Sequence, residues 1–284
     1  MSSIASNVRR TGIGMPRQAY GQRGLSLIEL MVAIGLGLLL VAGIGTVYLG
    51  SRQTYRTQEA NARVQETGRF ALEVIGRSLR VAGADANITA NVSAVTLECV
   101  PPTCTPVNGT DNSTNGTATD TLAVQYYAGL DQPDSDGDGV RESRNCLGNV
   151  ANADQMVTED YDLNGTDLRC TATVGAAAAQ TQPLVSDIED LQIIYGVDNT
   201  GGDQSADIYT STPTAAQWPN VVTAKVCVMV RSAELGLAQS GQRPLDCARA
   251  LGTATGASPA IADTRLHRAF VATYNLRNRI TNVP

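Results

Sequence analysis

Residues 23–43 read RGLSLIELMVAIGLGLLLVAG, and this stretch decides how the chain is organised. Residues 30–49 form a run of 20 residues without a charge. A helix of that length covers about 30 Å, which is the hydrocarbon thickness of a bilayer. An ordinary secretory signal has a shorter apolar region and a small-x-small cleavage site, of which residues 41–43, VAG, are a poor version. We therefore expect a transmembrane helix at residues 25–50.

A single acidic residue, Glu29, lies at the start of this apolar run. A charged side chain deep in lipid costs about 2.5–3.5 kcal/mol, so such residues usually have a partner. Cleavage between Gly24 and Leu25 would create a new amino terminus close to Glu29. Its positive charge can pair with Glu29 of the same chain or of a neighbouring subunit.

Residues 24–29, GLSLIE, followed by an apolar helix, resemble the type IV prepilin signal. The resemblance implies that a membrane aspartyl peptidase cuts after Gly24 on the cytoplasmic side and N-methylates Leu25. It also implies that Glu29 pairs with the amino terminus of the adjacent subunit during filament assembly. The sequence departs from the family pattern in having Leu25 where Phe is commonest and in its long leader, residues 1–24.

The charges are distributed unevenly along the chain. Residues 1–24 carry four Arg and no acidic residue, whereas residues 81–284 carry 11 basic and 23 acidic side chains. An acidic body argues against nucleic acid as a partner. Because Arg52, Arg56 and Arg63 follow the apolar run, the positive-inside rule says little about orientation. Cysteine placement and the processing motif indicate a single pass through the bacterial inner membrane, with a cytoplasmic amino terminus and a periplasmic body.

All six cysteines lie beyond the apolar run, which indicates an oxidising compartment and up to three disulfides. Fifteen pairings are possible for six cysteines. The favoured pairs are near neighbours, because each closes a polar, turn-rich segment: Cys99–Cys104, Cys146–Cys170 and Cys227–Cys247. Free buried thiols are the alternative, and the spacing disfavours a zinc site because no second close pair of cysteines accompanies the first.

The helix is predicted to continue through residues 51–83 as an amphipathic segment. An apolar stripe at helical spacing is formed by Val64, Ala71, Leu72, Ile75 and Leu79. Glu59 and Arg63, and likewise Glu73 and Arg77, stand at the i,i+4 spacing of a favourable ion pair, although a solvated helix face is the preferred explanation of these charges. Gly83 is the expected end of the helix.

The remaining residues, 84–284, read as a β-rich globular domain. Candidate strands lie at residues 92–100, 121–128, 191–197, 221–231 and 268–277. Thr-, Asn-, Gly- and Pro-rich stretches at residues 101–120, 171–183, 199–217 and 250–262 are expected to be surface loops. One long helix followed by an antiparallel sheet is an α+β, pilin-like class, with long disulfide-bearing loops.

Three segments resemble the PilW-like minor pilins of type IV pili. They are residues 65–83, QETGRFALEVIGRSLRVAG, residues 184–198, LVSDIEDLQIIYGVD, and residues 265–279, RLHRAFVATYNLRNR. The resemblance implies a subunit that helps prime pilus assembly, twitching motility and adhesion, alongside the major pilin, other minor pilins and a tip adhesin. A type II secretion pseudopilin and a membrane-tethered calcium-dependent adhesin or lectin are the alternatives.

Residues 134–142, DSDGDGVRE, have the spacing of the front of an EF-hand-type loop, in which alternate oxygens converge on Ca²⁺. The candidate ligands are Asp134, Asp136, Asp138, Val140 through its carbonyl, Glu142 and Asn145. A second, weaker run contains Asp160, Asp162, Asn164 and Asp167. A solvated acidic turn is the alternative for both runs. No cofactor other than Ca²⁺ is expected.

The sequence does not indicate an enzyme. His267 is the one histidine and lies in a strand-like run, where a structural role is more common than a catalytic one. Paired carboxylates lie in Gly-rich turns and not in an apolar pocket that raises a pKa. We therefore expect no catalytic residues.

Overall fold

The computed structural model describes residues 24–84, 86–90, 93–97, 99, 104–112, 119–128, 142–152, 155–200 and 203–279. Backbone contacts divide the chain into two compact units, Met1–Gln53 and Thr54–Pro284. The helix α1, Leu27–Val81, begins in the first unit and ends in the second. The amphipathic half of the helix therefore belongs with the β-rich body, which the sequence placed at residues 84–284.

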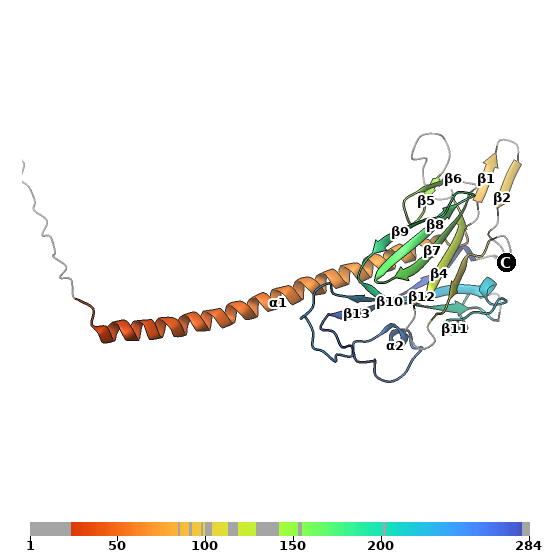
Figure 1. Ribbon diagram of the computed structural model, residues 1–284. Coiled ribbons are helices and arrows are strands. Elements are labelled where there is room, and N and C mark those ends of the chain that lie inside the picture. The colour runs from red at the N-terminus through yellow and green to blue at the C-terminus, as the bar shows by residue number, and fades with distance from the viewer. Residues whose placement is uncertain are drawn as a thin grey trace, which may run out of the picture. The chain divides into compact units, whose positions relative to one another are not determined.

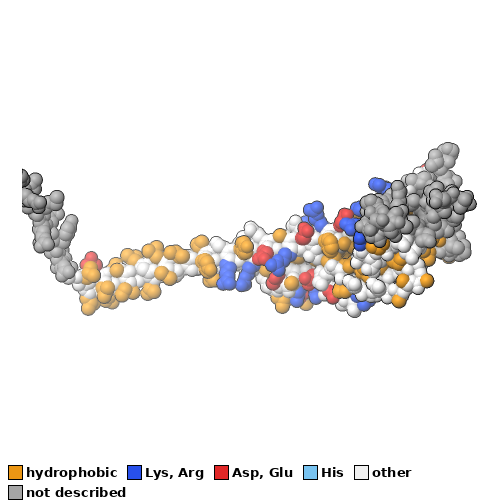
Figure 2. Space-filling view, turned by 90° about the horizontal axis from the view of Figure 1, so that it is seen from above, with side chains coloured by type: hydrophobic (Ala, Val, Ile, Leu, Met, Phe, Trp, Pro, Cys, Tyr) orange, Lys and Arg blue, Asp and Glu red, His pale blue; other side chains and the backbone are white. Residues whose placement is uncertain are grey.

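The first unit consists of the apolar half of α1. Every large apolar side chain from Leu25 to Leu49 is 52–77% exposed, and Figure 2 shows the resulting hydrophobic surface. Among the residues that the structure describes, α1 is the one helix long and apolar enough to cross a membrane, and its most apolar window has no buried residue. The complete exposure distinguishes this segment from the core helix of a soluble protein.

The second half of α1 packs on the body through its predicted apolar stripe. All five stripe residues, Val64, Ala71, Leu72, Ile75 and Leu79, are buried, as expected. The helix ends at Val81, just before Gly83, whose φ of 72° is the left-handed conformation that glycine adopts readily. The Gly83 amide then donates to the carbonyl of Gln125, which ties the helix end to a strand.

The body contains two larger antiparallel sheets (Figure 1). The five-stranded sheet has the order β3-β4-β7-β8-β9. Its strands are β3 Val107–Thr110, β4 Thr121–Tyr127, β7 Met156–Asn164, β8 Asp167–Val174 and β9 Gln180–Val185. Alternate residues of β4 and β8 are buried, so each of these strands turns one face to the core.

The four-stranded sheet has the order β11-β10-β12-β13. Its strands are β10 Ile188–Val197, β11 Ile208–Thr210, β12 Val221–Arg231 and β13 His267–Asn275. The remaining elements are the hairpins β1 Ala86–Ala90 with β2 Ser93–Leu97 and β5 Glu142–Arg144 with β6 Val150–Asn152, the helix α2 Cys247–Leu251, and the 3₁₀ turns η1 Trp218–Asn220 and η2 Arg277–Arg279.

The central strand β12 is covered on both faces. Val226, Val228 and Val230 join the main core with α1, whereas Cys227 and Met229 form a second small core with Cys247 of α2. Burial on both faces explains why β12 reads as a nearly continuous apolar run without alternation.

The structure confirms the predicted strands only in part. The predictions at residues 92–100, 121–128, 191–197, 221–231 and 268–277 correspond to β2, β4, β10, β12 and β13. The loops predicted at 101–120, 171–183 and 199–217 are loops only in part, since β3, the end of β8, the start of β9 and β11 lie there, and α2 reaches Leu251 in the loop predicted at 250–262. These strands are short or lie beside Gly, Pro and Asn, which obscured them in the sequence, although their Thr and Val residues favour strands.

Two glycines of α1 allow aromatic rings of β13 to lie directly against the helix. A Cβ atom on Gly68 would lie 2.3 Å from the Phe270 ring, and one on Gly76 would lie 2.3 Å from the Tyr274 ring. The Tyr274 hydroxyl donates to the Leu72 carbonyl at 2.6 Å. The first helix and the last strand of the described chain are therefore joined by ring-on-backbone packing.

Of the two ion pairs expected on the surface of α1, the structure contains one. Glu59 and Arg63 form the expected pair, with 2.6 Å between oxygen and nitrogen. Glu73 does not pair with Arg77 but with Arg80, at 3.5 Å. Arg77 instead lines a groove between α1 and the five-stranded sheet.

Replacing Gly76 by Val should destabilise the body, because the new side chain and the Tyr274 ring cannot occupy the same space. For residues 54–284 with intact disulfides, we expect Gly76→Val to lower the free energy of unfolding in urea by about 2 kcal/mol. Arg69→Val, at an exposed position of the same helix, should change it by less than about 0.5 kcal/mol. Equal stability of the two variants would contradict the packing.

Candidate functional site

The apolar helix begins with a polar cap. Gly24, Leu25 and Ser26 precede α1. The Ser26 hydroxyl accepts a hydrogen bond from the Glu29 amide at 3.3 Å, and its carbonyl accepts one from the Leu30 amide at 3.1 Å. This is the N-cap arrangement, in which a Ser three residues before a Glu satisfies a free amide of the first turn. Ser26 thus sets where the helix starts.

The cap places the expected processing and assembly residues at one end of the helix. Glu29 lies in the first turn of α1, where the helix dipole favours a negative charge. Leu25 is 75% exposed, so a terminus created before it is accessible. Residues 1–23 of the predicted leader, 1–24, lie outside the described residues. Gly24, Leu25 and Glu29 lie together at the amino-terminal end of an exposed apolar helix, and their processing and assembly roles stay predictions.

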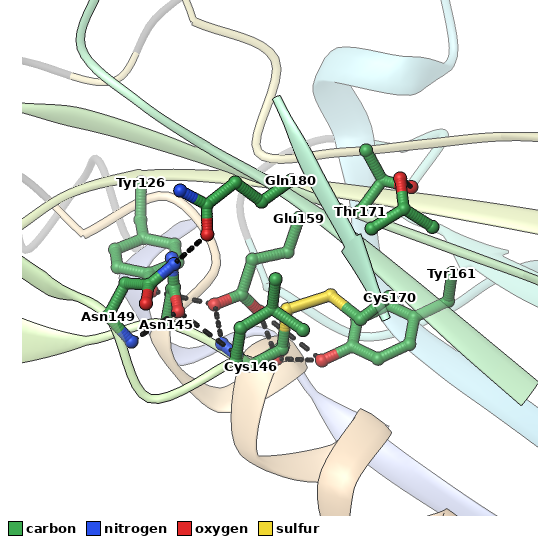
Figure 3. The surroundings of a disulfide bond; sticks show 12 residues. Tyr126, Asn145, Cys146, Asn149, Glu159, Tyr161, Cys170, Thr171 and Gln180 are labelled. Atoms are coloured by element: carbon green, nitrogen blue, oxygen red, sulfur yellow. Dashed lines mark hydrogen bonds between the residues drawn. A yellow bond between two sulfur atoms is a disulfide. The ribbon is translucent and has the colours of Figure 1, made fainter. Parts of the chain in front are cut away.

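A buried carboxylate, which the sequence interpretation did not identify, joins α1 to the five-stranded sheet. Glu159 on β7 is 1% exposed and accepts hydrogen bonds at both oxygens (Figure 3). Oε1 accepts from the Tyr126 hydroxyl at 2.9 Å and from the Cys146 amide at 2.8 Å. Oε2 accepts from the hydroxyls of Ser78 and Tyr161. Four donors compensate the burial of the charge.

The two tyrosines of this network remain protonated donors. Burial, followed by the negative charge of Glu159, raises the pKa of Tyr126 and of Tyr161 above their ordinary value. The alternation of Val157, Glu159 and Tyr161 in sequence was the signal for this arrangement, because residues two apart share one face of a strand.

The cysteines form the near-neighbour pairs that the sequence favours. The disulfides are Cys99–Cys104, Cys146–Cys170 and Cys227–Cys247. Cys146–Cys170 joins the segment after β5 to β8 beside Glu159 (Figure 3), and Cys227–Cys247 joins β12 to α2. Cys146–Cys170 therefore cross-links a segment that lines the groove beside α1, and Cys227–Cys247 lies within the second small core.

The first calcium run falls largely outside the described residues, which include neither Asp134, Asp136 and Asp138 nor Val140. Glu142 begins β5. The Asn145 side-chain oxygen accepts hydrogen bonds from the Leu147 and Asn149 amides, at 3.0 and 2.9 Å, so it is already engaged. Calcium binding by residues 134–142 stays a prediction.

The second calcium run has a different structure from the predicted loop. Asp160, Asp162 and Asn164 lie on β7, and Asp167 begins β8 across a tight hairpin turn. Asp162 forms an ion pair with Arg169. Within the described part of the chain, no group of three or more His, Cys, Asp or Glu side chains is close enough to hold a metal ion.

His267 lies buried between two carboxylates and connects neighbouring segments of the body. Its side chain is fully buried, Nδ1 lies 2.6 Å from Glu189 and Nε2 lies 2.8 Å from Asp263. Burial opposes the charged ring, but the hydrogen bonds to the two carboxylates outweigh it and raise the pKa of His267 above its ordinary value. The ring therefore links β13 to the start of β10 and to the preceding loop.

One buried acid, outside the Gly-rich turns that hold the paired carboxylates, lies in an environment that raises its pKa. Burial raises the pKa of Asp120 to about 7. Asp120 is 3% exposed, and its Oδ2 accepts a hydrogen bond from the Ile193 amide at 2.8 Å. The contact ties the segment before β4 to β10, and its position inside a Thr-rich stretch concealed it in the sequence.

Two family models match the chain. Residues 152–278 match Type IV Pilus-assembly protein W, PilW, and residues 20–45 match the prokaryotic N-terminal methylation motif. No curated protein matches the chain. Among solved structures, a type IV-like pilin from Thermus thermophilus is similar at 13% identity with a TM-score of 0.46, over 76% of this chain and 97% of that chain.

Glu189 and Asp263 should keep the His267 ring charged at pH values above the ordinary pKa of histidine. Because folding raises this pKa, the stabilisation is complete below about pH 6.5 and is lost as the pH rises through the folded-state pKa. Nuclear magnetic resonance titration of the single histidine measures this directly. Asp263→Asn and Glu189→Gln should each lower the pKa, and Asp207→Asn should not. Titration at or below the ordinary value would disprove the arrangement.

Calcium binding by residues 134–142 is tested by isothermal titration of residues 54–284 with disulfides intact. We expect heat at millimolar Ca²⁺, because alternate carboxylates on a tight turn can supply several oxygen ligands. Asp136→Asn combined with Asp138→Asn should abolish the heat. Absence of heat from the folded, unsubstituted domain would end the prediction.

Proposed function

Since the chain belongs to the PilW-like minor pilins of type IV pili, we propose that it is a low-abundance pilus subunit that primes or supports filament assembly. The observation that carries the proposal is an uncovered apolar helix headed by a capped Gly24–Glu29 motif. A soluble protein does not leave so much apolar surface in water. Lipid covers this surface before assembly, and apolar helices of neighbouring subunits cover it in the filament.

In this proposal, prepilin peptidase cuts between Gly24 and Leu25 and methylates Leu25. Glu29 then pairs with the terminal amine of the adjacent subunit. That pairing removes the cost of a lone carboxylate in an apolar environment and fixes the axial register of the helices. The body lies in the periplasm while the helix spans the inner membrane, and the mature subunit then enters the extracellular pilus. Its partners are the major pilin, other minor pilins and a tip adhesin.

The alternatives differ in what they require of the chain. A type II secretion pseudopilin uses the same anchor, but the match of residues 152–278 to a pilus-assembly protein favours the pilus. A membrane-tethered calcium-dependent adhesin requires no pairing at Glu29. The family is that of a structural subunit, and we propose no catalytic role.

Replacing Glu29 should exclude the subunit from the filament without unfolding the body. Tagged full-length chain is produced in its bacterium beside the untagged chain, so that pili still form. We expect Glu29→Ala to be cleaved but to reach sheared pili at about one tenth of the unsubstituted amount or less, because the buried charge pair is lost. Quantitative immunoblotting of pili and mass spectrometry of the mature amino terminus provide the two measurements.

Glu66→Ala is the matched control, since Glu66 is an exposed acid on the body half of the same helix. Its incorporation should be unchanged. Replacing Gly24 by Leu should leave the first 24 residues attached and block entry into pili. Glu29→Ala subunits in pili at the unsubstituted amount, or a mature protein that retains its leader, would refute the proposal. Deletion of the gene should reduce surface pili and twitching.

A further inference from the structure

A groove of about 510 Å³ lies between α1 and the five-stranded sheet. Its helix wall is formed by Phe70, Val74 and Arg77, and its sheet side includes Leu184 of β9 and the segment around Asn145. Phe70 is 50% exposed. The volume is within the usual range of about 300–1,000 Å³ for ligand-binding clefts, and the groove combines an apolar half with a polar end.

Asn145 supplies an unused hydrogen-bond donor to this groove. The residue is 6% exposed, and it lies close to Glu159 and Cys146 in Figure 3. Its oxygen accepts from the Leu147 and Asn149 amides, which fixes the orientation of the side-chain amide. The amide nitrogen is then the other terminal atom, and among the described residues it has no hydrogen-bond partner. A buried donor without a partner costs about 1–3 kcal/mol, so it favours an external acceptor.

The groove also carries a guanidinium that forms no ion pair in the described regions of the protein. Its charged lining residues are Glu73, Arg77, Arg144 and Glu159. Glu73 pairs with Arg80, and Glu159 is satisfied by its four donors. Arg77 forms no ion pair with any carboxylate that the structure describes. Arg77 and Asn145 both line the groove, and a guanidinium and an amide donor match a carboxylate, which accepts from both.

We propose that this groove docks a peptide segment of a neighbouring, different pilin subunit. The segment places an Asp or Glu carboxylate at Arg77 and the Asn145 amide, and an apolar side chain against Phe70 and Val74. The charge complementarity specifies the acid, and the half-exposed Phe70 specifies the apolar neighbour. The inference rests on the proposed function, because a low-abundance subunit in a filament is surrounded mainly by other pilins.

Site-specific photocrosslinking in cells that assemble pili tests the docking. The full-length chain carries p-benzoylphenylalanine in place of Phe70, a substitution that keeps an aromatic ring at the groove. After irradiation, mass spectrometry should identify one crosslinked peptide of another pilin, with an Asp or Glu within a few residues of the crosslink.

Variants in the same chain separate docking from folding. Arg77→Gln removes the charge, and Asn145→Asp keeps an oxygen for the two amides but replaces the donor with an acceptor. Each should lower the crosslink yield about tenfold, the effect of losing one charge-assisted hydrogen bond. Arg69→Gln removes a charge from an exposed position outside the groove and should leave the yield unchanged. Retention of the Cys146–Cys170 bond confirms folding.

Charge exchange then tests the direct contact. Arg77→Glu should abolish the crosslink, and replacing the partner's acid by Arg should restore it. Crosslinks only to a second copy or to lipid, or yields unaffected by Arg77→Gln, overturn the docking proposal while the chain is still found in pili. Absence of the unsubstituted chain from pili refutes the pilus function itself, and the docking proposal with it.

Discussion

The packing of aromatic rings of β13 on the glycine face of α1 is the contact on which the rest of the body depends. Phe270 and Tyr274 occupy the space that side chains at Gly68 and Gly76 would fill, and the Tyr274 hydroxyl donates to the helix backbone at Leu72. Because β13 is the last strand of the described residues, the four-stranded sheet and its helix complete each other only when this strand is in place. Ring-on-backbone packing of this kind tolerates almost no change of volume, since neither the helix backbone nor an adjacent strand can move far.

The position of α1 in turn determines the hydrogen-bond network around Glu159, which connects the helix to the five-stranded sheet. Once α1 is docked, the Ser78 hydroxyl reaches Glu159, whose other oxygen accepts from the Tyr126 hydroxyl and the Cys146 amide. A buried carboxylate with four donors is stabilising only in one arrangement, so it specifies how helix, sheet and disulfide-bonded segment meet. The same arrangement forms the groove, because the residues that hold α1 in place leave Arg77 and Asn145 among its lining residues. The groove is therefore a consequence of how the core packs.

Much of the architecture was readable from local patterns. A run of 20 uncharged residues implies a membrane-length helix whatever follows it. The Ser26 cap that starts this helix was recognised only in the structure. The apolar stripe from Val64 to Leu79 and the runs that became β10, β12 and β13 are equally local, since periodicity alone reports which face is buried. The near-neighbour cysteines followed from the same reasoning, because short polar segments between them limit which pairs can meet. By contrast, β7, β8 and β9 were missed, because their Asp, Gln and Pro residues hide the strand preference of their Thr and Val residues, and pairing between the strands decides the outcome.

By itself, then, the sequence determined the long apolar helix and the helix-plus-sheet class, and it predicted processing and assembly roles for Gly24, Leu25 and Glu29; all of these depend on residues close together in the chain. Only the tertiary structure decided that Glu159 is buried and satisfied, that Glu73 pairs with Arg80 and leaves Arg77 at the groove, and that the second acidic run is a hairpin. Each of these outcomes depends on groups brought together from distant parts of the chain. The sequence specifies which side chain stands at each position. The packing of the whole body determines its contacts, and these contacts set its charge, exposure and role.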